Sequence, residues 1–264
     1  MMKDLSIMLV QADLVWENPD RNRLVLGSLI HKGGEADLIL LPETFSTGFT
    51  MNASAFAEAP GGETEEWMRD MAEETGACIA GSYIVQEDGN YYNRFLAVTK
   101  KGIIAQYDKR HLFRMGSEHE IFTAGKKAVV FTLHGWRICP MICYDLRFPV
   151  WSRNRLKSNS VPAYDLLLYT ANWPFPRAPH WKLLLQARAV ENLAYVAATN
   201  RVGVDGKGVY HSGDSCIFNF QGTQLSSAVH METIVKKTIS GDALLEYRER
   251  FPAWMDSDGF AVAL

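Results

Sequence analysis

Each of three apolar runs of strand length is followed by a residue type that could take part in acyl-transfer chemistry. The pairs of run and residue are 37–41 with Glu43, 103–107 with Lys109, and 137–142 with Cys143. In α/β proteins, functional residues lie at the carboxyl ends of strands. A thiolate could attack a carbonyl carbon, a carboxylate could move protons, and an ammonium could stabilise the oxyanion. Each residue alone is more often a solvated charge or a core thiol, so the hypothesis requires that all three meet.

The cysteines favour one reactive thiol among four. They are Cys78, Cys139, Cys143 and Cys216, with no C-x-x-C pair and no His at zinc-finger spacing. A chain of 264 residues can bury a core without disulfides, so neither a disulfide framework nor a structural zinc site is expected. Cys143 lies between a strand and an expected helix. Because a helix N-terminus favours the thiolate, we expect a lowered pKa for Cys143 and core positions for the other three.

Composition and motifs exclude several classes of protein. Apolar residues make up 47% and charged residues 22%, and 27 Lys+Arg against 30 Asp+Glu give a net charge of −3. These values are ordinary for a globular protein and indicate neither a nucleic-acid nor a membrane partner. The sequence lacks a signal-peptide core, so a reducing, cytoplasmic location is expected. G-x-G-x-x-G, G-x-S-x-G and H-E-x-x-H are absent, so we expect no cofactor and no metal.

The elements that must position the three residues alternate between strands and helices. Strands are expected at 5–11, 37–41, 78–85, 91–99, 103–107, 129–133, 137–142, 165–169, 195–200, 215–220, 223–227 and 229–239. Helices are expected at 18–31, 63–75, 148–156, 181–192 and 243–250. Tight turns at 88–90 and 100–102 predict antiparallel neighbours. With no linker in the sequence, we expect one domain over 1–264, of the α/β class, with two mixed sheets packed face to face and helices outside.

The three segments resemble the catalytic segments of a known family. Leu41-Pro42-Glu43, Asp108-Lys109-Arg110-His111-Leu112-Phe113 and Cys143-Tyr144-Asp145-Leu146-Arg147-Phe148-Pro149 are similar, in the same order, to those of the nitrilase (carbon–nitrogen hydrolase) superfamily. The resemblance extends through Asn172-Trp173-Pro174 to Arg188-Ala189-Val190-Glu191-Asn192. It implies a four-layer α-β-β-α sandwich that needs no cofactor. It also implies a homodimer or higher homo-oligomer formed through helices.

The resemblance assigns a role to each catalytic residue. Glu43 would be the general base, Lys109 the oxyanion stabiliser and Cys143 the nucleophile that forms a thioester. The backbone N–H of Tyr144 would be a second oxyanion donor. The family has a second glutamate after the lysine, and the spacing to Gly125 favours Glu118 over Glu120.

The residues after the nucleophile indicate a branch of the family. Cys-Tyr-Asp-Leu-Arg-Phe is similar to the omega-amidase segment, whereas the Cys-Trp-Glu of true nitrilases is absent. The resemblance therefore implies hydrolysis of dicarboxylic acid monoamides such as 2-oxoglutaramate and 2-oxosuccinamate. The substrate-binding candidates are Phe49, Tyr144, Arg147, Asn172 and Trp173. Arg147 is the nearest candidate in sequence for the substrate carboxylate, and a structural ion pair is the alternative role for it.

Other functions remain open from the sequence alone. Another amidase or an N-carbamoyl hydrolase of the same superfamily would use the same three residues. A binding module that has lost catalysis could share the fold. A papain-like protease would need a histidine beside the thiol, for which His111 and His134 are the candidates.

Overall fold

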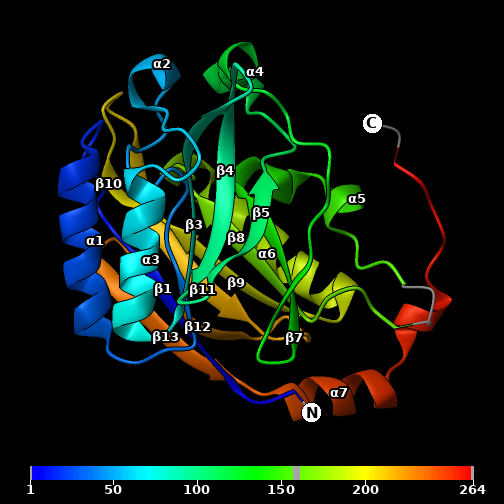
Figure 1. The fold of residues 1–264 in the computed structure, drawn as a ribbon. Coiled ribbons are helices and arrows are strands. Elements are labelled where there is room, and N and C mark those ends of the chain that lie inside the picture. The colour runs from blue at the N-terminus through cyan, green and yellow to red at the C-terminus, as the bar shows by residue number, and fades with distance from the viewer. Residues whose placement is uncertain (1, 157–160, 263–264) are drawn as a thin grey trace.

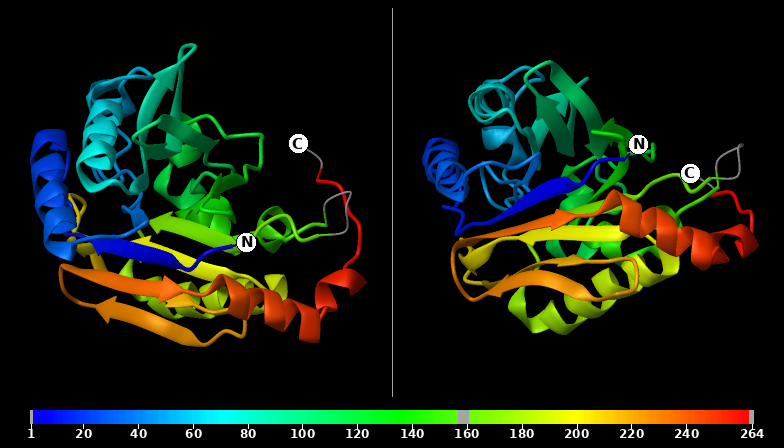
Figure 2. Two further views of the ribbon diagram at one scale, coloured as in Figure 1. Left: turned by 60° about the horizontal axis from the view of Figure 1, so that its bottom comes forward. Right: turned by 90° about the horizontal axis from the view of Figure 1, so that it is seen from below.

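The computed structural model describes residues 2–156 and 161–262, and its strands form two sheets that pack face to face. Helices α1 (Pro19–Gly33) and α3 (Glu63–Thr75) lie side by side on the outside of one sheet (Figure 1). Helix α6 (Ala178–Asn192) covers the outside of the other sheet (Figure 2). The expected α-β-β-α layering is therefore confirmed.

The first sheet has the strand order β13-β1-β2-β3-β4-β5. Its strands are β1 (Leu5–Gln11), β2 (Leu38–Leu40), β3 (Cys78–Glu87), β4 (Asn90–Thr99), β5 (Gly102–Asp108) and β13 (Thr233–Ile239). Strands β1, β2 and β3 are parallel. Strand β4 is antiparallel to both β3 and β5, as the two tight turns predicted. Because β5 consequently runs in the direction of β2, Glu43 and Lys109 leave the sheet at the same edge.

The second sheet has the order β10-β11-β9-β8-β7-β6, with β12 paired to β11. Its strands are β6 (Phe131–Leu133), β7 (Trp136–Ile142), β8 (Leu166–Ala171), β9 (Tyr195–Asn200), β10 (Val202–Val204), β11 (Tyr210–Phe218) and β12 (Gln224–Val229). Strands β7, β8 and β9 are parallel. Cys143 and Asn172 therefore follow neighbouring strands at one edge.

Period-2 patterning places strand β1 between two apolar layers. Leu5, Ile7 and Leu9 join the core between the sheets. Met8 and Val10 instead pack with apolar side chains from α1 and α3. The apolar run 7–10 within β1 thus contributes to both faces of the first sheet, which is why it does not alternate with polar residues.

Some expected elements differ from those observed. The helix expected at 148–156 is wrong: α5 (Pro149–Ser152) ends after one turn, because Asn154 is held by hydrogen bonds to Tyr164 and Asn192. The short elements α2 (Ala53–Phe56), α4 (Glu118–Ile121) and β10 carry no periodic signal and were not anticipated. Helix α7 (Gly241–Arg250) lies near its expected place. In the described part of the chain, four 3₁₀ turns span Arg114–Gly116, Cys143–Arg147, Phe175–Arg177 and Ala253–Asp256.

Among the helices of residues 2–156 and 161–262, none has the length and apolar character needed to cross a membrane.

Candidate active site

A buried lysine bridges two buried glutamates where the two sheets meet. The Nζ atom of Lys109 lies 2.7 Å from Oε1 of Glu43 and 2.9 Å from each carboxylate oxygen of Glu118. All three side chains are almost completely buried. The Nδ2 atom of Asn93 also donates to Glu43, at 2.9 Å, and to Glu118, at 3.3 Å. Glu120 is exposed and takes no part in this cluster.

The charges of this cluster stabilise one another. Burial lowers the pKa of Lys109, but the carboxylates of Glu118 and Glu43 outweigh burial and hold that pKa above its ordinary value. For Glu118, burial raises the pKa, with Lys109 opposing it and Glu43 adding to it. Because one ammonium serves two carboxylates, the cluster retains capacity to take up a proton.

A close backbone approach fixes the segment that carries Lys109. The N–H of Gly125 donates to the Lys109 carbonyl at 2.9 Å. A Cβ atom at residue 125 would lie 2.0 Å from the carbonyl oxygen of Asp108. Glycine is therefore required there, and the chain between Lys109 and Gly125 forms a loop that returns Glu118 to the lysine.

Cys143 occupies a strained turn directly after β7. Its φ is +42°, in the left-handed region that non-glycine residues rarely adopt, and the 3₁₀ turn Cys143–Arg147 follows. Burial raises the pKa of Cys143 well above its ordinary value, the nearby Glu43 carboxylate raises it further, and Lys109 opposes the shift. The expected lowered pKa is therefore wrong. The expectation relied on a helix N-terminus, but the turn after Cys143 is a single short 3₁₀ segment. Burial and the charge of Glu43 therefore determine the direction of the pKa shift.

Asp145 connects the turn that carries Cys143 to the segment that carries Lys109. Its Oδ2 atom accepts from the Tyr107 hydroxyl at 2.7 Å and from the Ile142 N–H at 3.0 Å. Its Oδ1 atom accepts from the His111 N–H at 3.0 Å and lies 2.7 Å from His111 Nδ1. Asp145 is fully buried. Three of these four contacts, to Tyr107 and His111, thus hold the two segments together.

Asn172, from the second sheet, holds Glu43, from the first. The backbone N–H of Asn172 donates to Glu43 Oε2 at 2.8 Å. Its side-chain Nδ2 donates to the Glu43 backbone carbonyl at 2.5 Å. Strand β8 ends one residue earlier, so the position of Glu43 depends on the packing of one sheet on the other.

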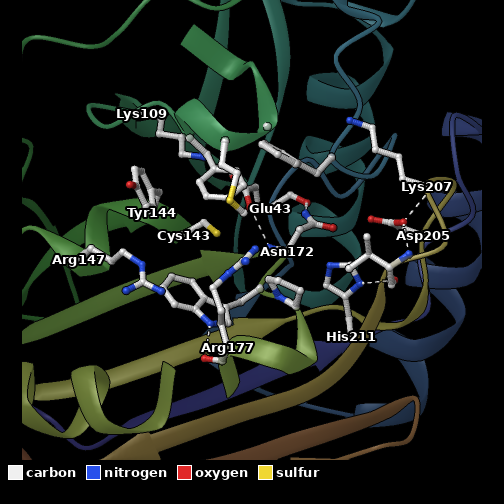
Figure 3. Close-up of a pocket in the computed structure, with 17 residues that line it drawn as sticks. Glu43, Lys109, Cys143, Tyr144, Arg147, Asn172, Arg177, Asp205, Lys207 and His211 are labelled. Atoms are coloured by element: carbon white, nitrogen blue, oxygen red, sulfur yellow. Dashed lines mark hydrogen bonds and ion pairs between the residues drawn. The ribbon is translucent and has the colours of Figure 1, made fainter. Parts of the chain in front are cut away.

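These groups face a cavity of about 250 Å³ (Figure 3). Of the expected catalytic residues, Glu43, Lys109 and Cys143 line it, whereas Glu118 lies behind Lys109. The five expected substrate-binding residues all line it: Phe49, Tyr144, Arg147, Asn172 and Trp173.

Sequence reasoning missed part of the cavity wall. Arg177, Asp205, Lys207 and His211 also line it, and Figure 3 shows the last three across the pocket from Arg147. Arg177 follows the same strand as Asn172, and that shared strand end was the available signal. Asp205 and Lys207 lie in the loop after β10, and His211 lies at the start of β11, ahead of the strand expected at 215–220.

The histidines do not support a papain-like site. His111 contacts Asp145 and stacks on Phe148 with ring centroids 3.8 Å apart, and neither it nor His134 lines the cavity. His211 lines it, but burial lowers its pKa to about 4. Within the described parts of the chain, no three His, Cys, Asp or Glu side chains are grouped to hold a metal ion.

Comparison with known proteins identifies the family. A carbon-nitrogen hydrolase family model matches residues 7–249. The chain belongs to the carbon-nitrogen hydrolase family. It is 46% identical to the omega-amidase YafV of Escherichia coli K12, over 99% of this chain and 100% of that protein. It is 33% identical to the 2-oxoglutaramate amidase of Bacillus subtilis, over 95% and 96% of the two chains.

Solved structures of the carbon-nitrogen hydrolase family agree with this fold. XC1258 from Xanthomonas campestris, a CN-hydrolase superfamily protein with an arsenic adduct in its active site, has a TM-score of 0.97. It is 45% identical and covers 99% of this chain and 100% of its own. Nit3 of Saccharomyces cerevisiae, at 21% identity, has a TM-score of 0.85 over 95% of each chain and supports the fold alone. The expected superfamily, its omega-amidase-like branch and its fold are confirmed.

Proposed function

We propose that this carbon-nitrogen hydrolase is an omega-amidase that cleaves the terminal amide of small dicarboxylic acid monoamides. Substrates of this class include 2-oxoglutaramate and 2-oxosuccinamate, and the products are the dicarboxylic acid and ammonia. The observation that carries the proposal is the meeting of Glu43, Lys109 and Cys143 at one cavity. The relatives named omega-amidase and 2-oxoglutaramate amidase support the substrate class.

In the first half-reaction, Cys143 is acylated. Glu43 takes the thiol proton as the sulfur adds to the amide carbon. A resident base is needed because burial and Glu43 hold the pKa of Cys143 above its ordinary value. Lys109 and the Tyr144 N–H stabilise the tetrahedral oxyanion. The carbon–nitrogen bond then breaks, Glu43 returns the proton to the nitrogen, and ammonia leaves a thioester.

In the second half-reaction, water hydrolyses the thioester. Glu43 takes a proton from water as its oxygen adds to the thioester carbon. The carbon–sulfur bond breaks, the sulfur recovers a proton, and the acid is released. Glu118 acts as a positioning residue, because both of its oxygens contact the Lys109 ammonium.

The wall of the cavity supports recognition of an acid. Arg147 is half-buried and lines the cavity beside Tyr144 and Trp173, where it could receive the substrate carboxylate. Phe49 adds an apolar wall, and its ring centroid lies 5.0 Å from Lys109 Nζ. Asn172 lines the cavity and positions Glu43.

An ammonia-release screen tests the proposed function. Purified protein and Cys143→Ala are incubated with 2-oxoglutaramate, succinamate, carbamoyl amines and nitriles. We expect release from the first two only, and none from Cys143→Ala. Intact-mass spectrometry after an acid quench should find an acyl adduct on Cys143. Activity on carbamoyl amines with none on 2-oxoglutaramate, or an adduct on Cys78 or Cys216, would overturn the proposal.

We also propose that residues 1–264 act as one domain and that the protein is a homodimer formed through helices. The exposed apolar residues Leu183 and Val190 on α6 support this contact surface. The four free, buried cysteines support a reducing location such as the cytoplasm. Sedimentation of Leu183→Glu beside the parent protein tests the dimer, and an unchanged mass would contradict this surface.

A further inference from the structure

Two half-buried guanidinium groups at the cavity lie against aromatic rings. The Cζ atom of Arg147 is 4.9 Å from the ring centroid of Trp173, and that of Arg177 is 5.4 Å from the ring centroid of Phe113. An Nη atom of Arg147 also lies 3.1 Å from Nδ1 of His180. Within residues 2–156 and 161–262, neither side chain has a carboxylate within ion-pair distance, and the Arg177 side chain makes no hydrogen bond.

This lack of a carboxylate partner contrasts with the buried arginines elsewhere in the chain. Arg94, Arg201 and Arg248 each contact an aspartate, at distances between 2.6 and 2.8 Å. Removing a guanidinium from water is costly unless an anion replaces the lost hydration. The arginines at the cavity therefore have unused capacity for an anion that enters from solvent.

The other charges of the cavity do not cancel this positive charge. The Lys109 ammonium already contacts Glu43 and Glu118. Asp205 accepts hydrogen bonds from the backbone N–H groups of Lys207 and Val209, each at 2.9 Å, and so stabilises its own loop. Figure 3 shows Asp205 across the pocket from Arg147.

Trp173 contacts both arginines. Nε1 of Trp173, whose ring supports Arg147, donates to the backbone carbonyl of Arg177 at 2.8 Å. Arg177 ends the 3₁₀ turn Phe175–Arg177 and immediately precedes α6. Trp173, in the segment after β8, thus contacts the side chain of Arg147 through its ring and the backbone of Arg177 through its N–H.

We propose that Arg177 is a specificity-determining residue that binds the substrate carboxylate together with Arg147. This inference rests on the proposed function for the identity of the amide. Two guanidinium groups offer paired donors to both oxygens of a carboxylate. The pair selects amides with an anionic far end over neutral amides of the same length, and it leaves the chemistry at Cys143 unchanged.

Two substrates of matched length test the proposal. Succinamate and butanamide differ only in a carboxylate that replaces a methyl group. For Arg177→Gln we expect kcat/KM for succinamate to fall by about 10- to 100-fold, mainly through KM, with butanamide unaffected. Arg177→Lys should recover part of the loss, because it keeps the charge. The exposed Arg114, which does not line the cavity, supplies the control Arg114→Gln.

Binding of the product succinate separates this inference from the proposed function. Calorimetry should find that wild type binds succinate about 10- to 100-fold more tightly than Arg177→Gln. If wild type hydrolyses neither amide, the proposed function fails, and succinate binding still decides the role of Arg177. The kinetics would overturn the proposal if Arg177→Gln lost activity equally on succinamate and butanamide, or on neither. The calorimetry would overturn it if wild type did not bind succinate, or if the variant bound it equally well.

Discussion

The hydroxyl of Tyr107 donates a hydrogen bond to Asp145 at 2.7 Å, and this bond joins the two segments that carry the lysine and the nucleophile. Tyr107 lies two residues before Lys109, and Asp145 lies two residues after Cys143. Both side chains are buried, and the same hydroxyl accepts from Trp151 Nε1 at 3.0 Å. The distance between lysine and thiol is therefore set by a contact that touches neither of them.

Tyr107→Phe should impair turnover without impairing binding. The substitution removes one hydrogen-bond donor from Asp145 and leaves the Trp151 N–H without an acceptor. The free energy of unfolding should therefore fall by about 1–3 kcal/mol. We expect kcat to fall about tenfold, with KM unchanged, because only the geometry of the reacting groups loosens. Urea unfolding and steady-state kinetics measure the two effects, with Tyr247→Phe as the control. A change in KM alone would contradict a positioning role.

Lys109→Met should nearly abolish turnover and lower the free energy of unfolding. Loss of one oxyanion donor costs about 10²–10³ in rate. Loss of the cation also leaves Glu43 and Glu118 buried without a counter-charge, which costs about 3–5 kcal/mol. Chemical denaturation and ammonia release report on the two losses, and the exposed Lys101→Met provides the control. A stable variant with wild-type turnover would contradict the site.

His211 should make stability depend on pH in the acid range. Burial holds its pKa at about 4, below the ordinary value of 6.5. Between about pH 6.5 and 4, His211 is protonated in the unfolded chain but neutral in the folded chain. The free energy of unfolding therefore decreases as the pH is lowered from about 6.5 to 4. The contribution is at most about 3 kcal/mol. His211→Gln should show a shallower fall than wild type and than the exposed His31→Gln, and identical pH profiles would contradict this account.

The charges of the cavity predict discrimination at the carbon beside the substrate carboxylate. Glutamine has an ammonium where 2-oxoglutaramate has a ketone. Arg147 and Arg177 line the cavity, and Figure 3 shows Asp205 across the pocket from Arg147, so an ammonium beside the bound carboxylate meets like charge. We expect kcat/KM for 2-oxoglutaramate to exceed that for glutamine at least about 100-fold. Coupled ammonia assays measure both values of kcat/KM. Comparable values would contradict discrimination by charge in this cavity.

The sequence predicted those features that arise from local pattern. The apolar residues of the run 37–41 form the buried strand β2 before Glu43, and the turn at 88–90 produces an antiparallel pair. The three catalytic segments were found because each follows an apolar strand. The choice of Glu118 over Glu120 agrees with the contacts of Glu118 to Lys109.

The features that the sequence did not predict depend on contacts between distant segments. The pKa of Cys143 rises because burial and Glu43 act on it, and neither cause is visible from its neighbours in the chain. Arg177 reaches the cavity from a short 3₁₀ turn, and His211 reaches it from the start of β11, ahead of the strand expected at 215–220. The helix expected at 148–156 ends early because Asn154 is hydrogen-bonded to Tyr164 and to the more distant Asn192.

The bond between Asn172 and Glu43 has a consequence for how activity appears during folding. Glu43 and Lys109 come from the first sheet, and Cys143 and Asn172 come from the second. A chain in which only one sheet has formed therefore has either the base or the nucleophile, but never both. During refolding, the recovery of turnover should coincide with the docking of the two sheets and follow the formation of each one. Partly folded chains, whose reactive thiol would meet many amides in a cell, thus lack the base that would make that thiol a catalyst.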